Sequence, residues 1–260
     1  MNFRFGSLLG ITVASLGLFG VTQAQASSYY NTTRLVRVTK TTKISRVSVK
    51  QKYKRVKTFT LHKGDYVYTK HTNRYAWGIT TAKTYHWNAK YQYCTYKVAS
   101  SNHSWFSVPK TISFDSTKHY VESSKSYSPS WTDSSWGNST INIDGINVYT
   151  VRKYKSYDGH NINGIVRIHY IIKAGRDISA FPGLGTLTTN TGIQVEAEDY
   201  TEGIDGDINS GVTKSGYVYY EIPDLKSAKA ITTFRLQWDM SYETNDDSDE
   251  NWYKTFDISL

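Results

Sequence analysis

The sequence predicts an all-β protein with two domains behind a short leader. Apolar and aromatic residues alternate with polar ones in many short stretches, which is the period of a half-buried strand. The chain contains 22 tyrosines, and alternating Tyr, Val, Ile and Thr favour strands. No stretch shows a helical period with caps. Positive charge is concentrated in the N-terminal half, which indicates two modules with different roles.

Residues 146–173 form the clearest element, and they read as two long strands joined by a turn. In the second strand the apolar side chains share one face, while Arg167 and His169 fall on the other. The apolar set is Val166, Ile168, Tyr170 and Ile172. Asp158-Gly159 and Asn163-Gly164 supply residues that tolerate positive φ where the chain reverses. We expect this pair to be the centre of the C-terminal domain.

The first 26 residues read as a secretory signal peptide. Arg4 is followed by an uncharged stretch, 5–22, and by the small-x-small sequence Ala24-Gln25-Ala26. The alternative is an uncleaved membrane anchor, for which eighteen uncharged residues are borderline. No other apolar run approaches a span, so we expect no transmembrane segment after cleavage. A mature chain that begins at Ser27 has one cysteine, Cys94, so no disulfide forms within it.

The two halves of the mature chain have net charges of opposite sign. Residues 27–110 hold 17 Lys and Arg against one acid, Asp65, for a charge of +16. Residues 111–260 hold 13 Lys and Arg against 21 Asp and Glu, for −8. A strongly basic secreted module favours an anionic partner.

The basic module, 27–110, shows five or six short apolar runs within about 75 residues, and Lys63-Gly64-Asp65 forms a tight turn. Such spacing favours a small SH3-like barrel. The sequences LHKGDYVY, YAWGI and YCTYKVASSNHSWFSV resemble the SH3-like modules of surface proteins from Gram-positive, lactic-acid-type bacteria. That resemblance covers this one module, and it implies association with the cell wall.

The densest run of cations in this module predicts a polyanion-binding surface. Wall teichoic acid is the expected partner, and nucleic acid would satisfy the same charge only non-specifically. The alternative is a solvated face that aids solubility. The predicted contact residues are Lys43, Arg46, Lys50, Lys52, Lys54, Arg55 and Lys57. Trp77, Trp87 and Trp105 are candidates for stacking on sugar rings, although single tryptophans in strands more often belong to a core.

Residues 111–140 contain ten serines and are predicted as a linker by composition. Trp131 and Trp136 do not suit a free linker, so we expect them to pack onto the C-terminal domain as an edge segment. The flexible part is then expected at 117–128.

Residues 141–260 are predicted as an immunoglobulin-like antiparallel β-sandwich of about seven strands. The sequences GIVRIHYIIKAG, KSGYVYYEIP and ITTFRLQW resemble the immunoglobulin-like domain of uncharacterised Gram-positive lipoproteins and surface antigens. The first strand of that family ends in an Asn-rich turn, whereas here it runs into residues 173–177, so the match is partial. The family has no assigned catalytic residues.

Reaction chemistry has little support in the sequence. Cys94 lies in a strand-like stretch without a partner motif, and no serine-nucleophile or histidine-metal motif is present. The acidic stretches 205–211 and 245–250 are similar to calcium loops but lack the full ligand pattern. No acid is placed opposite Glu196 and Glu198. No metal and no cofactor are therefore predicted.

The preferred interpretation is a non-enzymatic secreted protein, non-covalently associated with the cell wall, whose sandwich presents a binding surface. The alternative is a wall-modifying enzyme targeted by the basic module. A third reading is an inhibitor or an immune-type binding domain.

Overall fold

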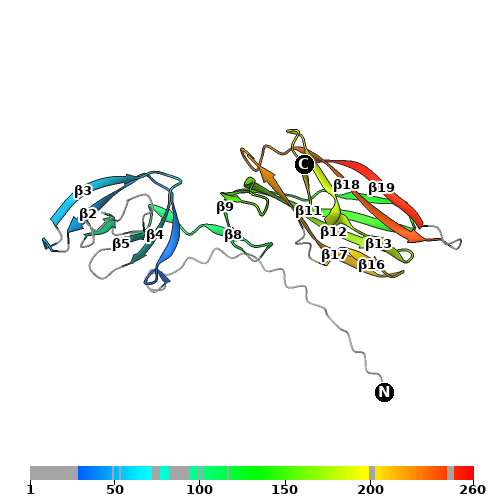
Figure 1. Cartoon of the computed structure of the whole chain (residues 1–260), viewed down its shortest axis with the longest axis horizontal. Coiled ribbons are helices and arrows are strands. Elements are labelled where there is room, and N and C mark those ends of the chain that lie inside the picture. Colours follow the sequence, from blue (N-terminus) through cyan, green and yellow to red (C-terminus); the bar gives the residue numbers. More distant parts are fainter. Residues whose placement is uncertain are drawn as a thin grey trace, which may run out of the picture. The chain divides into compact units, whose positions relative to one another are not determined.

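The computed structural model describes residues 29–48, 50–52, 54–71, 77–81, 94–98, 100, 102–115, 117–198, 203–244 and 249–260. The predicted signal peptide, 1–26, and Trp87 lie outside these residues. The chain divides into two compact units, Met1–Val108 and Pro109–Leu260. Both are built from β-strands, blue to teal in the first unit and green to red in the second (Figure 1). The predicted all-β class is confirmed.

The first unit is a curled antiparallel sheet (Figure 1). Its seven described strands run in the order β3-β2-β6-β5-β4-β1-β7. Their bounds are β1 (Arg34–Val38), β2 (Thr42–Ser48), β3 (Lys54–Leu61), β4 (Tyr66–His71), β5 (Trp77–Thr81), β6 (Cys94–Val98) and β7 (Phe106–Ser107). One face of the curl encloses a core that includes Val36, Ile44, Leu61 and Trp105. The SH3-like assignment of this unit stays a prediction.

The second unit is a two-layer antiparallel sandwich. The described strands of its first sheet are β8 (Lys110–Ile112), β9 (His119–Tyr127), β10 (Trp131–Trp136), β11 (Ser139–Lys155), β12 (Asn161–Lys173) and β17 (Thr213–Pro223). Those of the second sheet are β13 (Ile178–Ala180), β14 (Thr186–Thr189), β15 (Gln194–Glu196), β16 (Gly206–Ile208), β18 (Thr233–Glu243) and β19 (Asp249–Ser259). A short 3-10 helix, Pro182–Leu184, joins β13 to β14. The sandwich predicted for the C-terminal half is confirmed.

Strands β11 and β12 form the predicted central pair. Their antiparallel ladder runs from Thr140 opposite Lys173 to Lys155 opposite Asn161. The predicted apolar face of β12 is fully buried, because its side chains meet those of the second sheet in a shared core. Arg167 and His169 lie on the other, partly exposed face. His169 Nδ1 lies 2.6 Å from a carboxylate oxygen of Asp144.

Only one of the two predicted turn dipeptides forms the turn. Gly159 has φ +83° in the β11–β12 connection, as a reversing residue requires. Asn163 and Gly164 instead lie inside β12. The Asn163 side chain accepts a hydrogen bond from the Leu225 backbone N–H and donates one to the Leu225 carbonyl. A Cβ on Gly164 would approach Leu225 to 2.7 Å, so this glycine serves a close packing contact rather than a turn.

The region predicted as a linker, 111–140, differs most from expectation. It carries most of β8 and all of β9 and β10, and the boundary between the units falls earlier, after Val108. The serines of β9 are exposed, while the backbone of this strand is paired with β11. Composition therefore indicated a linker, although ladder hydrogen bonds hold the segment in the sheet. Trp131 and Trp136 pack against the core, as expected.

We predict that Ile168→Ala destabilises the second unit by about 2–5 kcal/mol, because it leaves a cavity in the core. His169→Ala, one residue along the same strand, removes only a partly exposed contact and is expected to cost about 1 kcal/mol or less. Calorimetry of the full chain measures both effects through the melting transition of this unit. Equal losses of stability in the two variants would contradict our conclusion that one face of β12 is buried and the other is partly exposed to solvent.

Candidate functional site

The β2–β3 hairpin carries the predicted polyanion-binding residues. Its strands pair from Thr42 opposite Leu61 to Ser48 opposite Lys54. Six of the seven predicted contact residues are exposed, and they come from both strands and from the connection between them. The six are Lys43, Lys50, Lys52, Lys54, Arg55 and Lys57.

Arg46 requires a correction, because the structure buries it. Its exposed fraction is 8%, and its guanidinium carbon lies 5.7 Å from the ring centroid of Phe59. Successive strand residues point to opposite faces, so Arg46 shares the inner face with Ile44, whereas Lys43 lies on the outer face. The sequence run therefore does not form one continuous surface.

The positive field of the hairpin has little internal compensation. Asp65 is the single acid of residues 27–110. Its carboxylate accepts a hydrogen bond from the His62 backbone N–H at 2.7 Å, in the connection between β3 and β4. A surface with such an excess of one sign attracts mobile counter-ions and charged polymers.

Trp77 and Trp105 are buried in the core of the first unit. Their exposed fractions are 3% and 2%, and both pack edge-on against Phe106, with ring centroids 4.8 and 4.6 Å away. An indole enclosed in this way presents no face to a sugar ring. Large aromatic side chains supply most of the apolar area that so small a core can bury, which explains their position.

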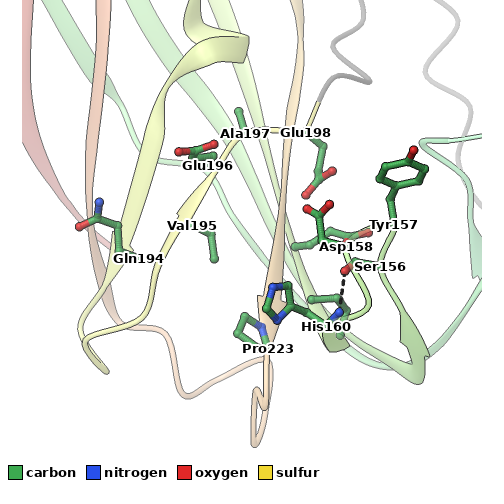
Figure 2. A pocket seen from close by; sticks show the side chains of 12 residues that line it. Ser156, Tyr157, Asp158, His160, Gln194, Val195, Glu196, Ala197, Glu198 and Pro223 are labelled. Atoms are coloured by element: carbon green, nitrogen blue, oxygen red, sulfur yellow. Dashed lines mark hydrogen bonds between the residues drawn. The ribbon is translucent and has the colours of Figure 1, made fainter.

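The second unit contains a carboxylate-lined pocket of about 490 Å³ (Figure 2). Four carboxylates line it, from the β11–β12 turn, from the segment around β15 and from β17. They belong to Asp158, Glu196, Glu198 and Glu221. Figure 2 shows the carboxylates of Glu198 and Asp158 facing one another, with Tyr157 and His160 beside them. The pocket can therefore hold a ligand with positive charge or several hydrogen-bond donors.

Sequence reasoning missed this pocket. The sequence places no acid opposite Glu196 and Glu198, and the turn that carries Asp158 lies almost forty residues before them. The two segments meet through long-range packing, which leaves no local pattern in the sequence. Acids next to a turn and a strand end were the only available signal, and such acids are common on solvated loops.

Glu221 differs from the other acids of the pocket because its exposed fraction is only 8%. Burial raises its pKa, although the Tyr154 hydroxyl donates a hydrogen bond to its Oε1. Burial, together with the carboxylate of Glu221, in turn raises the pKa of Tyr154. A carboxyl with a raised pKa beside exposed acids is an arrangement that can transfer protons.

A second buried group lies behind Tyr154. The ring of His119 is 4.4 Å from that of Tyr154, and its Nε2 lies 3.1 Å from a carboxylate oxygen of Asp115. Burial acts to raise the pKa of Asp115, but hydrogen bonds from Thr117 and His119 outweigh it and hold that pKa below its usual value. The His119 ring, in β9, therefore packs against Tyr154, and Tyr154 contacts Glu221 in the pocket.

The described residues contain no group of three or more His, Cys, Asp or Glu that could hold a metal ion. In the acidic stretch 205–211, Asp205 accepts a hydrogen bond from the Gly183 backbone N–H, which is a structural role. Residues 245–248 of the second acidic stretch lie outside the described part of the chain. Cys94 begins β6, and its side chain is also outside that part.

No family model matches the sequence, and no curated protein is significantly similar to it. A functionally unknown protein from Listeria monocytogenes EGD-e is similar in structure, with 14% identity, a TM-score of 0.35, and coverage of 53% of this chain and 86% of that one. A secreted protein from Mycobacterium tuberculosis is similar at 13% identity and a TM-score of 0.23, over 52% of this chain and 94% of that one. Within the part of the chain that is described, no helix has the length and apolar character to cross a membrane.

We predict that Glu221→Gln gains stability relative to the wild type as the pH rises from 4 to 7. A carboxyl whose pKa is raised by folding stabilises the protein below its unfolded-state pKa, about 4.3, and loses this contribution as the pH rises through the folded-state value. Glutamine stays neutral and still accepts a hydrogen bond from Tyr154. Thermal denaturation at both pH values measures the difference.

Glu196→Gln is the control for this measurement, because it removes an exposed carboxylate from the same pocket. An equal response of the two variants to pH would show that burial of Glu221 is not the cause.

Proposed function

We propose that this chain is a secreted, non-enzymatic protein held non-covalently at the bacterial cell wall by its first unit. That unit binds an anionic wall polymer of the teichoic-acid class, and the sandwich presents a surface to a further partner. The observation that carries the proposal is the display of six exposed cations on one hairpin, in a region with a single acid. The resemblance of the first unit to SH3-like wall-associated modules supports the same assignment.

Binding of a charged polymer depends on the number of contacts that form at the same time. Each contact between an exposed lysine and a phosphate is weak in water, but a flexible polymer engages many at once. Such binding depends on salt, because the Debye length falls from about 8 Å at physiological ionic strength to about 3 Å at 1 M. Nucleic acid meets the same charges only through its backbone, without sequence preference.

We predict that the full chain binds purified Gram-positive walls at low salt and is released by 1 M NaCl. Removing four hairpin charges should weaken wall binding at least about tenfold, a difference of about 1.4 kcal/mol. The matched control removes four exposed lysines from the second unit, so both proteins have the same net charge. The hairpin variant is Lys50→Gln, Lys52→Gln, Lys54→Gln and Arg55→Gln, and the control variant is Lys118→Gln, Lys173→Gln, Lys226→Gln and Lys229→Gln.

Co-sedimentation with walls, before and after removal of teichoic acid, measures this binding. Equal weakening by the two variants would contradict a hairpin site, and undiminished binding in 1 M NaCl would contradict an electrostatic one.

A second candidate function, a wall-modifying hydrolase, is favoured by one observation. Glu221 has a raised pKa, and the exposed acids Asp158 and Glu196 line the same pocket together with the partly buried Glu198. Glycoside hydrolysis commonly uses two carboxyl groups in unlike environments, one protonated as the acid and one ionised. In this reading Glu221 is the general acid.

Purified peptidoglycan distinguishes the two functions. The non-enzymatic proposal expects no release of reducing sugars by the wild-type protein beyond the level without protein. Hydrolysis that is abolished by Glu221→Gln and retained by Glu196→Gln would establish the second candidate and overturn the first.

A further inference from the structure

The carboxylate pocket of the second unit has apolar walls as well as acids. At about 490 Å³ it has the size of a site for a small organic ligand. Four apolar side chains from β12, from the segment around β15 and from β17 line it beside the four carboxylates. They are Ile162, Val195, Ala197 and Pro223. No lysine or arginine is among the described residues of this lining, so the walls supply no permanent positive charge.

Glu221 is the most buried of the four carboxylates, and its side chain is nine-tenths buried. The hydrogen bond from the Tyr154 hydroxyl goes to Oε1, and among the described residues no group donates one to Oε2. Burial raises the pKa of Glu221, and the carboxylate of Asp158 acts in the same direction. A positively charged donor in the pocket would relieve both effects, because it pairs with the ionised carboxylate.

A tyrosine ring lies beside these acids. The Tyr157 side chain is fully exposed in the β11–β12 turn, whereas tyrosine rings are more often at least partly buried. Figure 2 shows it next to the facing carboxylates of Asp158 and Glu198. The face of an aromatic ring attracts a cation, as a carboxylate does. The ring and the acids therefore favour a ligand of the same charge.

The chemistry of the pocket decides which kind of cation fits. No group of three or more His, Cys, Asp or Glu among the described residues could hold a metal ion, so these acids do not converge on one ion. A guanidinium is a planar fork that suits a single carboxylate. A protonated primary amine instead donates three hydrogen bonds in different directions, and its alkyl chain packs on apolar walls. Acids on three separate segments, together with apolar side chains, fit this group best.

We propose that this pocket binds a primary alkylammonium group, either a lysine side chain of a peptide or a free alkylamine. The ammonium group donates hydrogen bonds to Asp158, Glu198 and Glu221, and the alkyl chain packs on Val195 and other apolar side chains of the lining. The Tyr157 ring contacts the cation at the mouth of the pocket. The inference rests on the part of the proposed function that gives the sandwich a further partner, and it names the chemistry of that partner.

The test is an NMR titration of the full chain at pH 7 with three probes. A tripeptide, acetyl-Gly-Lys-Gly-amide, carries the ammonium group, and the same tripeptide acetylated on its lysine keeps the chain without the charge. The third probe, n-butylamine, carries the ammonium group without a peptide. We expect the lysine tripeptide to bind at least about tenfold more tightly than its acetylated form. Its chemical-shift changes should be confined to the pocket.

Variants of the full chain test the assignment to this pocket. Asp158→Asn keeps a residue that suits the turn and removes the charge, so it should weaken binding about two- to fivefold. Glu221→Gln should weaken it at least as much, because the amide oxygen accepts from Tyr154 and the NH₂ group then replaces Oε2. Tyr157→Leu should weaken it about twofold. The control, Glu243→Gln, removes an exposed acid of the same unit outside this pocket and should change the affinity less than about twofold.

Thermal melts show whether each variant keeps its fold. Equal binding of the lysine tripeptide and its acetylated form, or equal weakening by Asp158→Asn and Glu243→Gln, would overturn the pocket and leave wall binding by the first unit standing. Loss of wall binding in co-sedimentation, with amine binding intact, would overturn the wall-binding function and leave the pocket. Tighter binding of the lysine tripeptide than of n-butylamine supports a peptide lysine as the ligand, and equal binding supports a free alkylamine.

Discussion

The backbone ladder between β11 and β12 is the interaction on which the second unit depends. These two strands are the longest of the first sheet, and every other described strand of that sheet except β8 pairs directly with one of them. Their inner side chains meet β13, β14 and β18 in a single apolar core. Because the chain has one cysteine, no disulfide within it can replace this ladder. The turn that joins the two strands also carries Asp158, so the same ladder positions one wall of the carboxylate pocket.

In the first unit, the alternation of side chains along β2 has a comparable effect. It places Lys43 toward solvent and Arg46 toward the core, although only two residues separate them. The aromatic rings that fill this small core, including Trp77 and Trp105, are thereby withdrawn from ligand binding, and the ring of Phe59 comes to lie beside two cations. The exposed cations of the hairpin are thereby separated from Arg46, which lies among the core side chains. Net charge attracts any polyanion.

The two units also differ in the sign and the pairing of their charged side chains. Among the described residues of the second unit, Arg235 pairs with Asp257, His169 with Asp144, and His119 with Asp115. The first unit has one acid for its many cations. Residues 111–260 carry a charge of −8 and repel a polyanion, while the excess of positive charge in residues 27–110 attracts one. This contrast is the physical reason to assign polymer binding to the first unit and to look for a discrete ligand in the second.

The sequence by itself determined the strand content, the buried face of β12 and the separation of charge, because each of these depends on residues close together in the chain. Alternation alone identified Val166, Ile168, Tyr170 and Ile172 as core. Composition was misleading for 111–140, where serine indicated a linker and ladder hydrogen bonds decided otherwise. Only the tertiary structure could bring Asp158 to Glu198 or place Arg46 opposite Lys57, because both depend on how separate strands pair and in which register. Register is set by long-range packing and by bulges such as the one next to Arg46, and neither leaves a local pattern in the sequence.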